Sequence, residues 1–377
     1  MTDDAVGEGW GWVQVIASLE AMAPAERAAF MPRSGTEKLV QAFPELAAVE
    51  FEDHEVAGPD GPIPTRSYSV PGSAGGTGFV WVHGGAFIGG DLDMDEAHWV
   101  GLALAARGIS VLSVDYRKCL DGVHFPAPSD DVLAAWLWAL EHAEQLGTAP
   151  DRLHLGGGSA GANLTAGVTK RLRDGAGRLP ASLVLVYPLV HPELPPFGED
   201  LQVALASAEL TVDFPPAAIR DINLNFAGDE AALVDPYAFA ANGDVSGQPP
   251  VYVLNAEADR LRASGEAYAE QLRAAGVQVL VELEPGTQHG HVNEPYSEGG
   301  QRSIDRIAHW LHGDPGVRSW EPGRSPTRTR SHPSTTSSSA TPSSAGHGST
   351  SAESSSSHAT AATSQGSSPP PAPRSSS

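Results

Sequence analysis

The sequence is poor in cysteine, and it contains no long hydrophobic run. Its one cysteine, Cys119, excludes an internal disulfide, so nothing in the composition demands an oxidising compartment. No window approaches 18 consecutive apolar residues, which argues against a transmembrane helix. The first four residues include Asp3 and Asp4, and the N-terminus lacks the basic segment and apolar run of a secretory signal. These absences predict a cytoplasmic protein.

Positive charge is also scarce, because 23 Lys and Arg residues stand against 46 Asp and Glu residues, a formal net charge of −23. Such an acidic surface repels phosphates and anionic lipids, so we expect neither nucleic acid nor a membrane as partner. The sequence has no H-E-x-x-H motif and no Cys/His cluster, and Asp91, Asp93 and Asp95 lack the rest of a calcium loop. We therefore expect no metal.

The composition divides the chain into three parts. From about Gly323 the sequence consists mainly of Ser, Thr, Pro, Ala and Gly, which cannot bury enough apolar surface to fold, so residues 315–377 are predicted to be a disordered tail. Residues 1–50 contain two helix-like stretches and are predicted to form N-terminal cap helices. Residues 51–314 form the predicted α/β domain, with an insertion at about 191–227 that belongs to the cap.

Strands and helices alternate from Phe79 onward. The expected strands cover 79–82, 109–114, 152–155, 183–187, 251–254 and 277–283, and the expected helices 99–107, 129–146, 160–173, 265–275 and 303–311. Strands that are apolar throughout, with helices between them, indicate a mainly parallel sheet covered on both faces. The fold class is therefore α/β. The insertion at 191–227 would lie above the carboxyl ends of the strands, where open α/β sheets bind ligands.

The segment Gly157–Gly161 matches the motif G-x-S-x-G and stands between an expected strand and an expected helix. A serine at the tip of such a sharp turn projects its oxygen from the sheet, and the helix N-terminus behind it favours a developing anion. The small residues on either side let strand and helix pass each other. The alternative is a glycine-rich turn or phosphate loop. The context favours Ser159 as a nucleophile.

A second glycine motif, His83–Phe87, follows the expected strand 79–82. Consecutive glycines allow backbone N–H groups to approach a substrate oxygen, and fixed donors of this kind stabilise an oxyanion by about 3 kcal/mol each. We assign Gly84, Gly85 and Ala160 as the oxyanion-hole donors. The alternative is a plain strand-ending turn. His83 is interpreted as a residue that shapes this loop.

A serine nucleophile needs a base within hydrogen-bond reach, and in this architecture the chain order is Ser, acid, His. His289 lies in the loop directly after the last expected strand, and Gly290 beside it leaves room for an acyl group. His291 is the competing candidate. His191 also follows a strand, but no acid separates it from Ser159 in the required order.

The acid is expected to close the preceding strand, and Glu257 and Asp259 both lie there. Asp259 is preferred because it lies beyond the strand, where a loop can turn back to His289. The acid holds the imidazole tautomer and stabilises the imidazolium. Ser159, Asp259 and His289 thus form the predicted catalytic triad of a serine hydrolase.

With these residues the chain resembles the hormone-sensitive-lipase-like family of α/β hydrolases, the bacterial esterase/lipase group, over residues ~50 to ~312. The motifs that carry the resemblance are His83–Phe87, Asp115-Tyr116-Arg117, Phe125–Pro128, Ala256–Arg262 and His289-Gly290. The resemblance implies an α/β-hydrolase fold, hydrolysis of short- to medium-chain acyl esters, no cofactor, and a cap built from the N-terminal helices and an insertion.

Three features depart from the family pattern. Gly158 stands before the nucleophile, where the family usually has Asp or another polar residue, so a side chain that supports the elbow is missing. The loop at residues 118–124 replaces the usual Leu-Ala-Pro-Glu run and is about one residue longer. The Ser/Thr/Pro-rich tail has no family counterpart.

Two other functions stay open at this point: hydrolysis of lactones or amides by the same triad, and ligand binding without catalysis on the same fold. The substrate is expected to be a small-molecule ester, and both a monomer and a homodimer fit the sequence. The acyl pocket depends on how the aromatic residues of the cap fold over Ser159. These residues are Trp10, Trp12, Phe30, Phe197 and Phe214.

Overall fold

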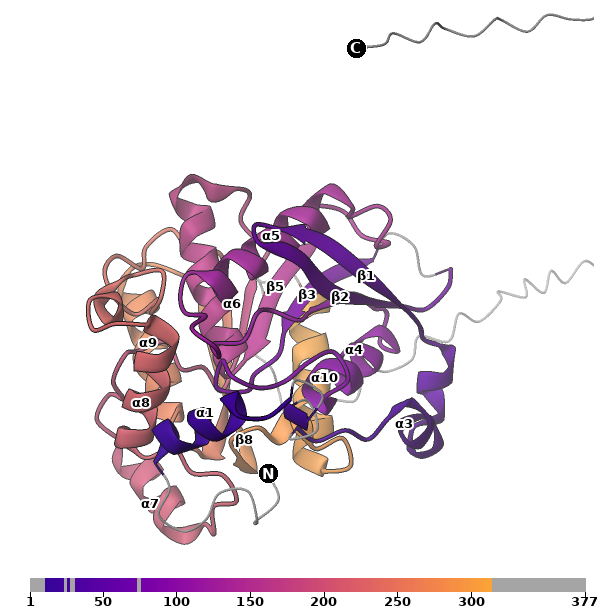
Figure 1. Cartoon of the computed structure of the whole chain (residues 1–377). Helices are drawn as coiled ribbons and strands as arrows, with labels where there is room; N and C mark the ends of the chain where they lie inside the picture. Colours follow the sequence, from indigo (N-terminus) through magenta and orange to yellow (C-terminus); the bar gives the residue numbers. More distant parts are fainter. Residues whose placement is uncertain (1–10, 24–25, 28–30, 73–75, 314–377) are drawn as a thin grey trace, which may run out of the picture. The chain divides into compact units, whose positions relative to one another are not determined.

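Eight strands form one sheet in the computed structural model, which describes residues 11–23, 26–27, 31–72 and 76–313 (Figure 1). The strands are β1 (Glu50–Gly58), β2 (Gly61–Ser69), β3 (Thr77–Val82), β4 (Ile109–Val114), β5 (Leu153–Gly158), β6 (Leu183–Val186), β7 (Val251–Ala258) and β8 (Val279–Gln288). Their order is β1-β2-β4-β3-β5-β6-β7-β8. Strand β2 pairs antiparallel with both of its neighbours, whereas the six strands β3 to β8 run parallel. The predicted fold class is confirmed.

The first two strands were not predicted as strands, and their composition explains why. β1 carries four acidic residues within Glu50–Glu55, and β2 contains Pro62 and Pro64, residue types that are depleted in strands. β1 lies at the edge of the sheet and its side chains are mostly exposed, so apolar alternation is weak there. The predicted strand 109–114 agrees with β4.

Helices cover both faces of the sheet. They are α1 (Trp12–Glu20), α3 (Thr36–Ala42), α4 (Asp95–Ala105), α5 (Ala127–Glu141), α6 (Ala160–Arg171), α7 (Glu199–Ser207), α8 (Pro216–Ala227), α9 (Arg262–Ala274) and α10 (Glu298–His312), with short helical turns η1 (Pro44–Ala48), η2 (Leu172–Ala176), η3 (Ala232–Val234) and η4 (His291–Asn293). None of the helices in the described ranges is long and apolar enough to cross a membrane.

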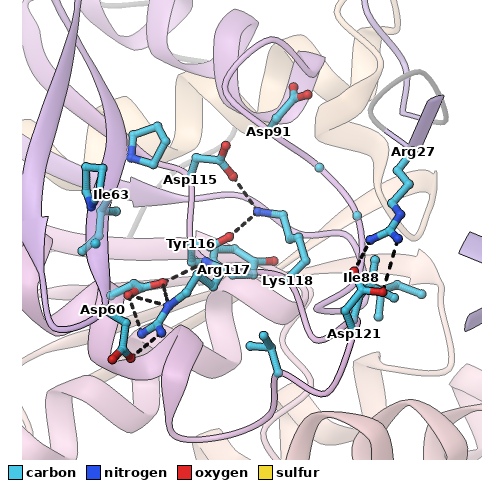
Figure 2. Close-up of a pocket in the computed structure, with 18 residues that line it drawn as sticks. Arg27, Asp60, Ile63, Ile88, Asp91, Asp115, Tyr116, Arg117, Lys118 and Asp121 are labelled. Atoms are coloured by element: carbon cyan, nitrogen blue, oxygen red, sulfur yellow. Dashed lines mark hydrogen bonds and ion pairs between the residues drawn. The ribbon is translucent and has the colours of Figure 1, made fainter. Parts of the chain in front are cut away.

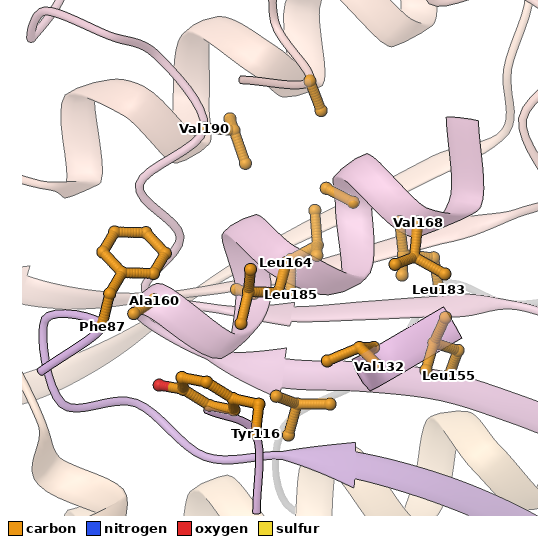
Figure 3. Close-up of a cluster of buried hydrophobic side chains, with 14 of the residues drawn as sticks. Phe87, Tyr116, Val132, Leu155, Ala160, Leu164, Val168, Leu183, Leu185 and Val190 are labelled. Carbon is orange, nitrogen blue, oxygen red and sulfur yellow. The ribbon is translucent and has the colours of Figure 1, made fainter. Parts of the chain in front are cut away.

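The core alternates with the two-residue period of the strands. Val80 and Val82 of β3 join the core cluster that includes side chains of α5, α6 and α9, whereas Phe79 and Trp81 join the cluster that includes α4 and α10. Figure 3 shows part of the first cluster, where Leu164 and the neighbouring apolar side chains of α6 lie over the strands. Close packing on both faces fixes the strand ends on which the functional loops are carried.

The predicted cap segments fall on α1 and α3 and, for the insertion, on α7 and α8. The ring of Trp12 in α1 stacks on Phe214, just before α8, with ring centroids 5.7 Å apart. The predicted tail at 315–377, Trp10 and Phe30 lie outside the described residues. The division of the chain into cap, α/β domain and tail stays a prediction.

Burial lowers the pKa of four histidines among the described residues to about 4. They are His98, His154, His191 and His291. In the unfolded chain the ordinary value is about 6.5. Between pH 6.5 and 4 the unfolded state therefore binds more protons than the folded state. For each additional proton that the unfolded state binds, the free energy of unfolding falls by about 1.4 kcal/mol for every unit by which the pH is lowered.

We therefore expect the midpoint of urea unfolding to fall as the pH is lowered from 6.5 to 4. Unfolding curves measured at half-unit pH steps test this, with His154→Asn as the variant that should flatten the pH dependence. An unfolding free energy that is constant over this pH range would contradict the expectation.

Candidate active site

Ser159 lies at the junction of β5 and α6, with φ 51° and ψ −117°. A non-glycine residue with positive φ is strained, and such strain persists only where the surroundings impose it. Here the Ser159 amide donates to Val186 O of β6 at 2.9 Å, and its carbonyl accepts from Asn163 N of α6 at 3.1 Å. The side chain is thus presented at the N-terminus of α6.

Two glycines allow this sharp turn. A Cβ atom on Gly161 would overlap the carbonyl oxygen of Val82 at the end of β3, and one on Gly157 would collide with the Gly161 backbone. The contact between strand and helix therefore leaves no space for a side chain at either position. This is the reason that the spacing G-x-S-x-G predicts the turn from sequence.

His289 and Asp259 approach Ser159 from two other strand ends. His289 follows β8, and its Nε2 lies 2.9 Å from Ser159 Oγ. Asp259 follows β7, and its Oδ2 lies 2.7 Å from His289 Nδ1. The side chains of His289 and Asp259 are 8% and 1% exposed, so the chain of hydrogen bonds is largely shielded from water. The structure thus brings the three predicted residues together.

The competing candidates have other partners. His291 Nε2 lies 2.8 Å from Ser303 Oγ, and burial lowers its pKa to about 4. His191 Nδ1 lies 2.9 Å from Ser264 Oγ. Glu257 Oε2 accepts a hydrogen bond from Gly286 N at 2.7 Å. Each of these three side chains is thus hydrogen-bonded to a group other than Ser159 or His289.

One predicted oxyanion-hole donor is corrected by the structure. The amide of Gly84 donates to Glu96 Oε2 at 3.2 Å, inside the protein, so this hydrogen is already engaged. In the described part of the chain, the amides of Gly85, Ala86 and Ala160 meet no acceptor. Ala86 was missed because a backbone N–H leaves no mark on the side-chain pattern. Its positive φ of 53°, beside Gly85 at 116°, is visible in the structure alone.

His83 orders the loop that carries these amides. Its Nδ1 donates to Gly84 O at 2.7 Å, and its ring stacks on Tyr116 with centroids 4.9 Å apart. Its Nε2 lies 3.5 Å from Asp115 Oδ1. Burial alone would raise the pKa of Asp115, but Lys118 and His83 lower it well below the ordinary value. These contacts agree with the loop-shaping role expected of His83.

A small apolar pocket of about 10 Å³ borders Ser159, which is room for about one water molecule. Phe214 lines this pocket, and its ring meets the His289 ring edge to face with centroids 4.9 Å apart. Two contacts join the segment around Phe214 to the residues next to His289 and Asp259. Gln288 Oε1 accepts a hydrogen bond from Thr211 N at 2.8 Å, and Arg260 Nε forms an ion pair with Asp213 Oδ1 at 2.6 Å.

A larger pocket of about 520 Å³ lies along residues 88–91 and does not include Ser159 (Figure 2). Charged pairs line it, among them Arg27 with Asp121 at 2.7 Å and Lys118 with Asp115 at 2.5 Å. The small pocket is therefore the one that borders the Ser159 hydroxyl.

Comparison with known proteins gives concordant results. A model of the α/β-hydrolase fold family matches residues 79–293. Carboxylesterase NlhH of Mycobacterium tuberculosis is 34% identical over 255 residues, which cover 66% of this chain and 78% of that protein. Esterase LipI of the same organism is 35% identical over 283 residues, which cover 72% and 84% of the two chains.

Solved structures of esterases are also similar. The thermostable carboxylesterase EstE1, cloned from a metagenomic library, has a TM-score of 0.65 and 27% identity, covering 81% of this chain and 98% of that one. An esterase of Pyrobaculum calidifontis has a TM-score of 0.62 and 28% identity, covering 79% and 96%.

Proposed function

This chain belongs to the α/β-hydrolase fold family, and from that membership and the geometry around Ser159 we propose that it is a serine carboxylic-ester hydrolase. The observation that carries the proposal is the continuous hydrogen-bond chain from Ser159 through His289 to Asp259. The similarity of this chain to carboxylesterase NlhH and esterase LipI over most of their length supports ester cleavage in particular.

In the proposed first step, Ser159 Oγ attacks the ester carbonyl carbon while His289 Nε2 takes the hydroxyl proton. The 2.9 Å contact between these atoms suits that transfer. Asp259 accepts the Nδ1 hydrogen, so Nε2 is left as the proton acceptor, and its negative charge stabilises the imidazolium that forms.

The negative charge on the former carbonyl oxygen is stabilised by the amides of Gly85, Ala86 and Ala160. Ala160 is the first residue of α6, so its N–H has no partner within the helix, and the helix dipole adds to the effect. Donors of this kind contribute about 3 kcal/mol each to the transition state. His289 then gives its proton to the departing alkoxide. In the second step His289 takes a proton from the water that attacks the acyl-enzyme and returns it to Ser159 Oγ as the acid product leaves.

For the substrate we propose short- to medium-chain acyl esters of small molecules. The pocket beside Ser159 is apolar and confined, with Phe214, Ile219 and Leu261 among its lining residues. A long acyl chain therefore requires the Phe214 side chain to move, whereas an acetyl group requires less displacement. The stacking of Trp12 on Phe214 supports a further proposal, that α1, α7 and α8 form the cap over this pocket.

We also propose that the protein is cytoplasmic. The composition supports this location, because a chain with one cysteine forms no internal disulfide and so does not need an oxidising compartment to fold.

The Phe214→Ala variant tests the proposed pocket. We expect its kcat/KM for p-nitrophenyl octanoate, relative to acetate, to rise about 10-fold, because each methylene group accommodated in an apolar pocket contributes about 1–3 kcal/mol. A series of p-nitrophenyl esters from acetate to palmitate provides the measurement, and acetate should be favoured over palmitate in the wild-type protein.

Tyr296→Ala is the matched control, since Tyr296 is exposed and stacks on Phe43 away from the pocket. Its chain-length profile should follow that of the wild type. An unchanged profile in Phe214→Ala would show that this ring does not limit the acyl pocket.

A further inference from the structure

A buried carboxylate, Glu96, lies next to the nucleophile turn and is not one of the three proposed catalytic side chains. It is the second residue of α4 and is 2% exposed. The helix start is fixed on β3, because Trp81 Nε1 donates to the Glu96 carbonyl at 2.7 Å. This contact sets the place from which the Glu96 side chain reaches under the active site.

The Glu96 carboxylate joins three segments of the site. Oε2 accepts a hydrogen bond from Gly84 N at 3.2 Å, in the segment His83–Phe87 that we call the oxyanion loop. It also accepts one from Asn293 Nδ2 at 3.1 Å, in the turn after His289. Oε1 accepts from the hydroxyl of Tyr187 at 2.7 Å. The Tyr187 ring in turn lies against the ring of His289, with centroids 4.8 Å apart.

Glu96 also occupies the space beside Gly158, the residue before the nucleophile. A Cβ atom on Gly158 would overlap Glu96 Oε1. Even alanine at position 158 therefore requires Glu96 to move. Gly158 and the long Glu96 side chain fit together as a pair, in which helix α4 provides the polar group that the turn itself lacks.

We propose that Glu96 is a positioning residue of this active site. Its carboxylate holds the oxyanion loop, the turn that carries Ser159 and the loop that carries His289 in their relative positions. Its contact with Gly84 N orients the loop whose next two amides, those of Gly85 and Ala86, face the oxyanion. Its bonds to Tyr187 and Asn293 support His289 from behind. This role rests on the proposed serine hydrolase function, since it acts through those groups.

The experiment compares Glu96→Leu with Glu96→Gln in the full chain, using p-nitrophenyl acetate. Leucine fills the volume but accepts no hydrogen bonds, so we expect kcat to fall by about 100-fold, as expected for a misplacement of about 1 Å, with KM within about threefold. Glutamine can accept from Gly84 and Asn293 and donate to Tyr187, so we expect it to recover most of that loss. A thermal unfolding scan accompanies each variant.

A second comparison applies even if Glu96→Leu does not fold. Gly158→Ala should lower kcat about 10-fold or more in the wild-type background, because its methyl group displaces Glu96. In the Glu96→Ala background, where this clash is removed, the same change should have at most about a twofold effect. Equal losses in both backgrounds would overturn the proposed pairing.

The role of Glu96 is also overturned if Glu96→Leu folds and keeps kcat within about threefold of the wild type, whatever its melting temperature. A wild-type protein with no turnover dependent on Ser159 would remove the proposed function itself, and the positioning role with it. The two failures are therefore distinguishable from one set of measurements.

Discussion

Replacing Ser159 with alanine abolishes ester turnover, with an expected fall in kcat on the order of 10⁵-fold or more, as for other triad nucleophiles. Without the hydroxyl no acyl-enzyme forms, and what remains is the stabilisation by the oxyanion-hole amides. The fold should be unaffected, because Ser159 Oγ contacts His289 and the backbone is held by Val186 and Asn163. Steady-state hydrolysis of p-nitrophenyl acetate by the purified variant measures the effect.

The chain offers a matched control for this substitution. Ser182 also forms a buried hydrogen bond with a histidine, 2.7 Å from His154 Nδ1, but outside the proposed site. Ser182→Ala should keep kcat within about threefold of the wild type. Turnover that survives in Ser159→Ala would favour ligand binding at this pocket and catalysis elsewhere.

Asp259→Asn is expected to lower kcat by about 10⁴-fold, the scale observed when the acid of a comparable triad is changed to its amide. In this variant a neutral amide would face His289 Nδ1, and it neither fixes the reactive tautomer nor stabilises the imidazolium. Because the substitution preserves shape, KM and the melting temperature should change little. The pre-steady-state release of p-nitrophenol separates a slow acylation from a loss of binding.

Glu257→Gln is the control for the acid assignment. Glu257 accepts from Gly286 N and lies two residues before Asp259, so it was the alternative acid in the sequence. We expect its kcat within about threefold of the wild type. A large loss in Glu257→Gln together with an active Asp259→Asn would assign the acid to Glu257 instead.

The predicted triad could be read from the sequence because chain order and strand ends restrict each residue strongly. Asp259 and His289 directly follow β7 and β8, and parallel strands place their carboxyl ends at one edge of the sheet. The prediction failed at Gly84, since a glycine pair indicates close backbone approach but not which amide hydrogen faces outward. The Gly84 amide instead donates to the Glu96 carboxylate, a tertiary contact that no local pattern shows.

The same limit applies to the rest of the site. The missing side chain at Gly158 was visible in the sequence, but its complement, Glu96, lies 62 positions earlier and is recognised through packing alone. The stack of Trp12 on Phe214 likewise joins two segments that no local pattern connects. β1 escaped detection because an edge strand need not bury an alternating apolar face, and β2 because it contains Pro62 and Pro64.

Covalent labelling with a p-nitrophenyl phosphonate, followed by mass spectrometry of the digested protein, tests the central claim most directly. The account predicts one phosphonyl group per chain, located on Ser159, with activity lost in proportion to labelling and no such adduct in Ser159→Ala. Loss of activity with Ser159 unmodified, or an adduct on another residue that alone accounts for the inhibition, would contradict it.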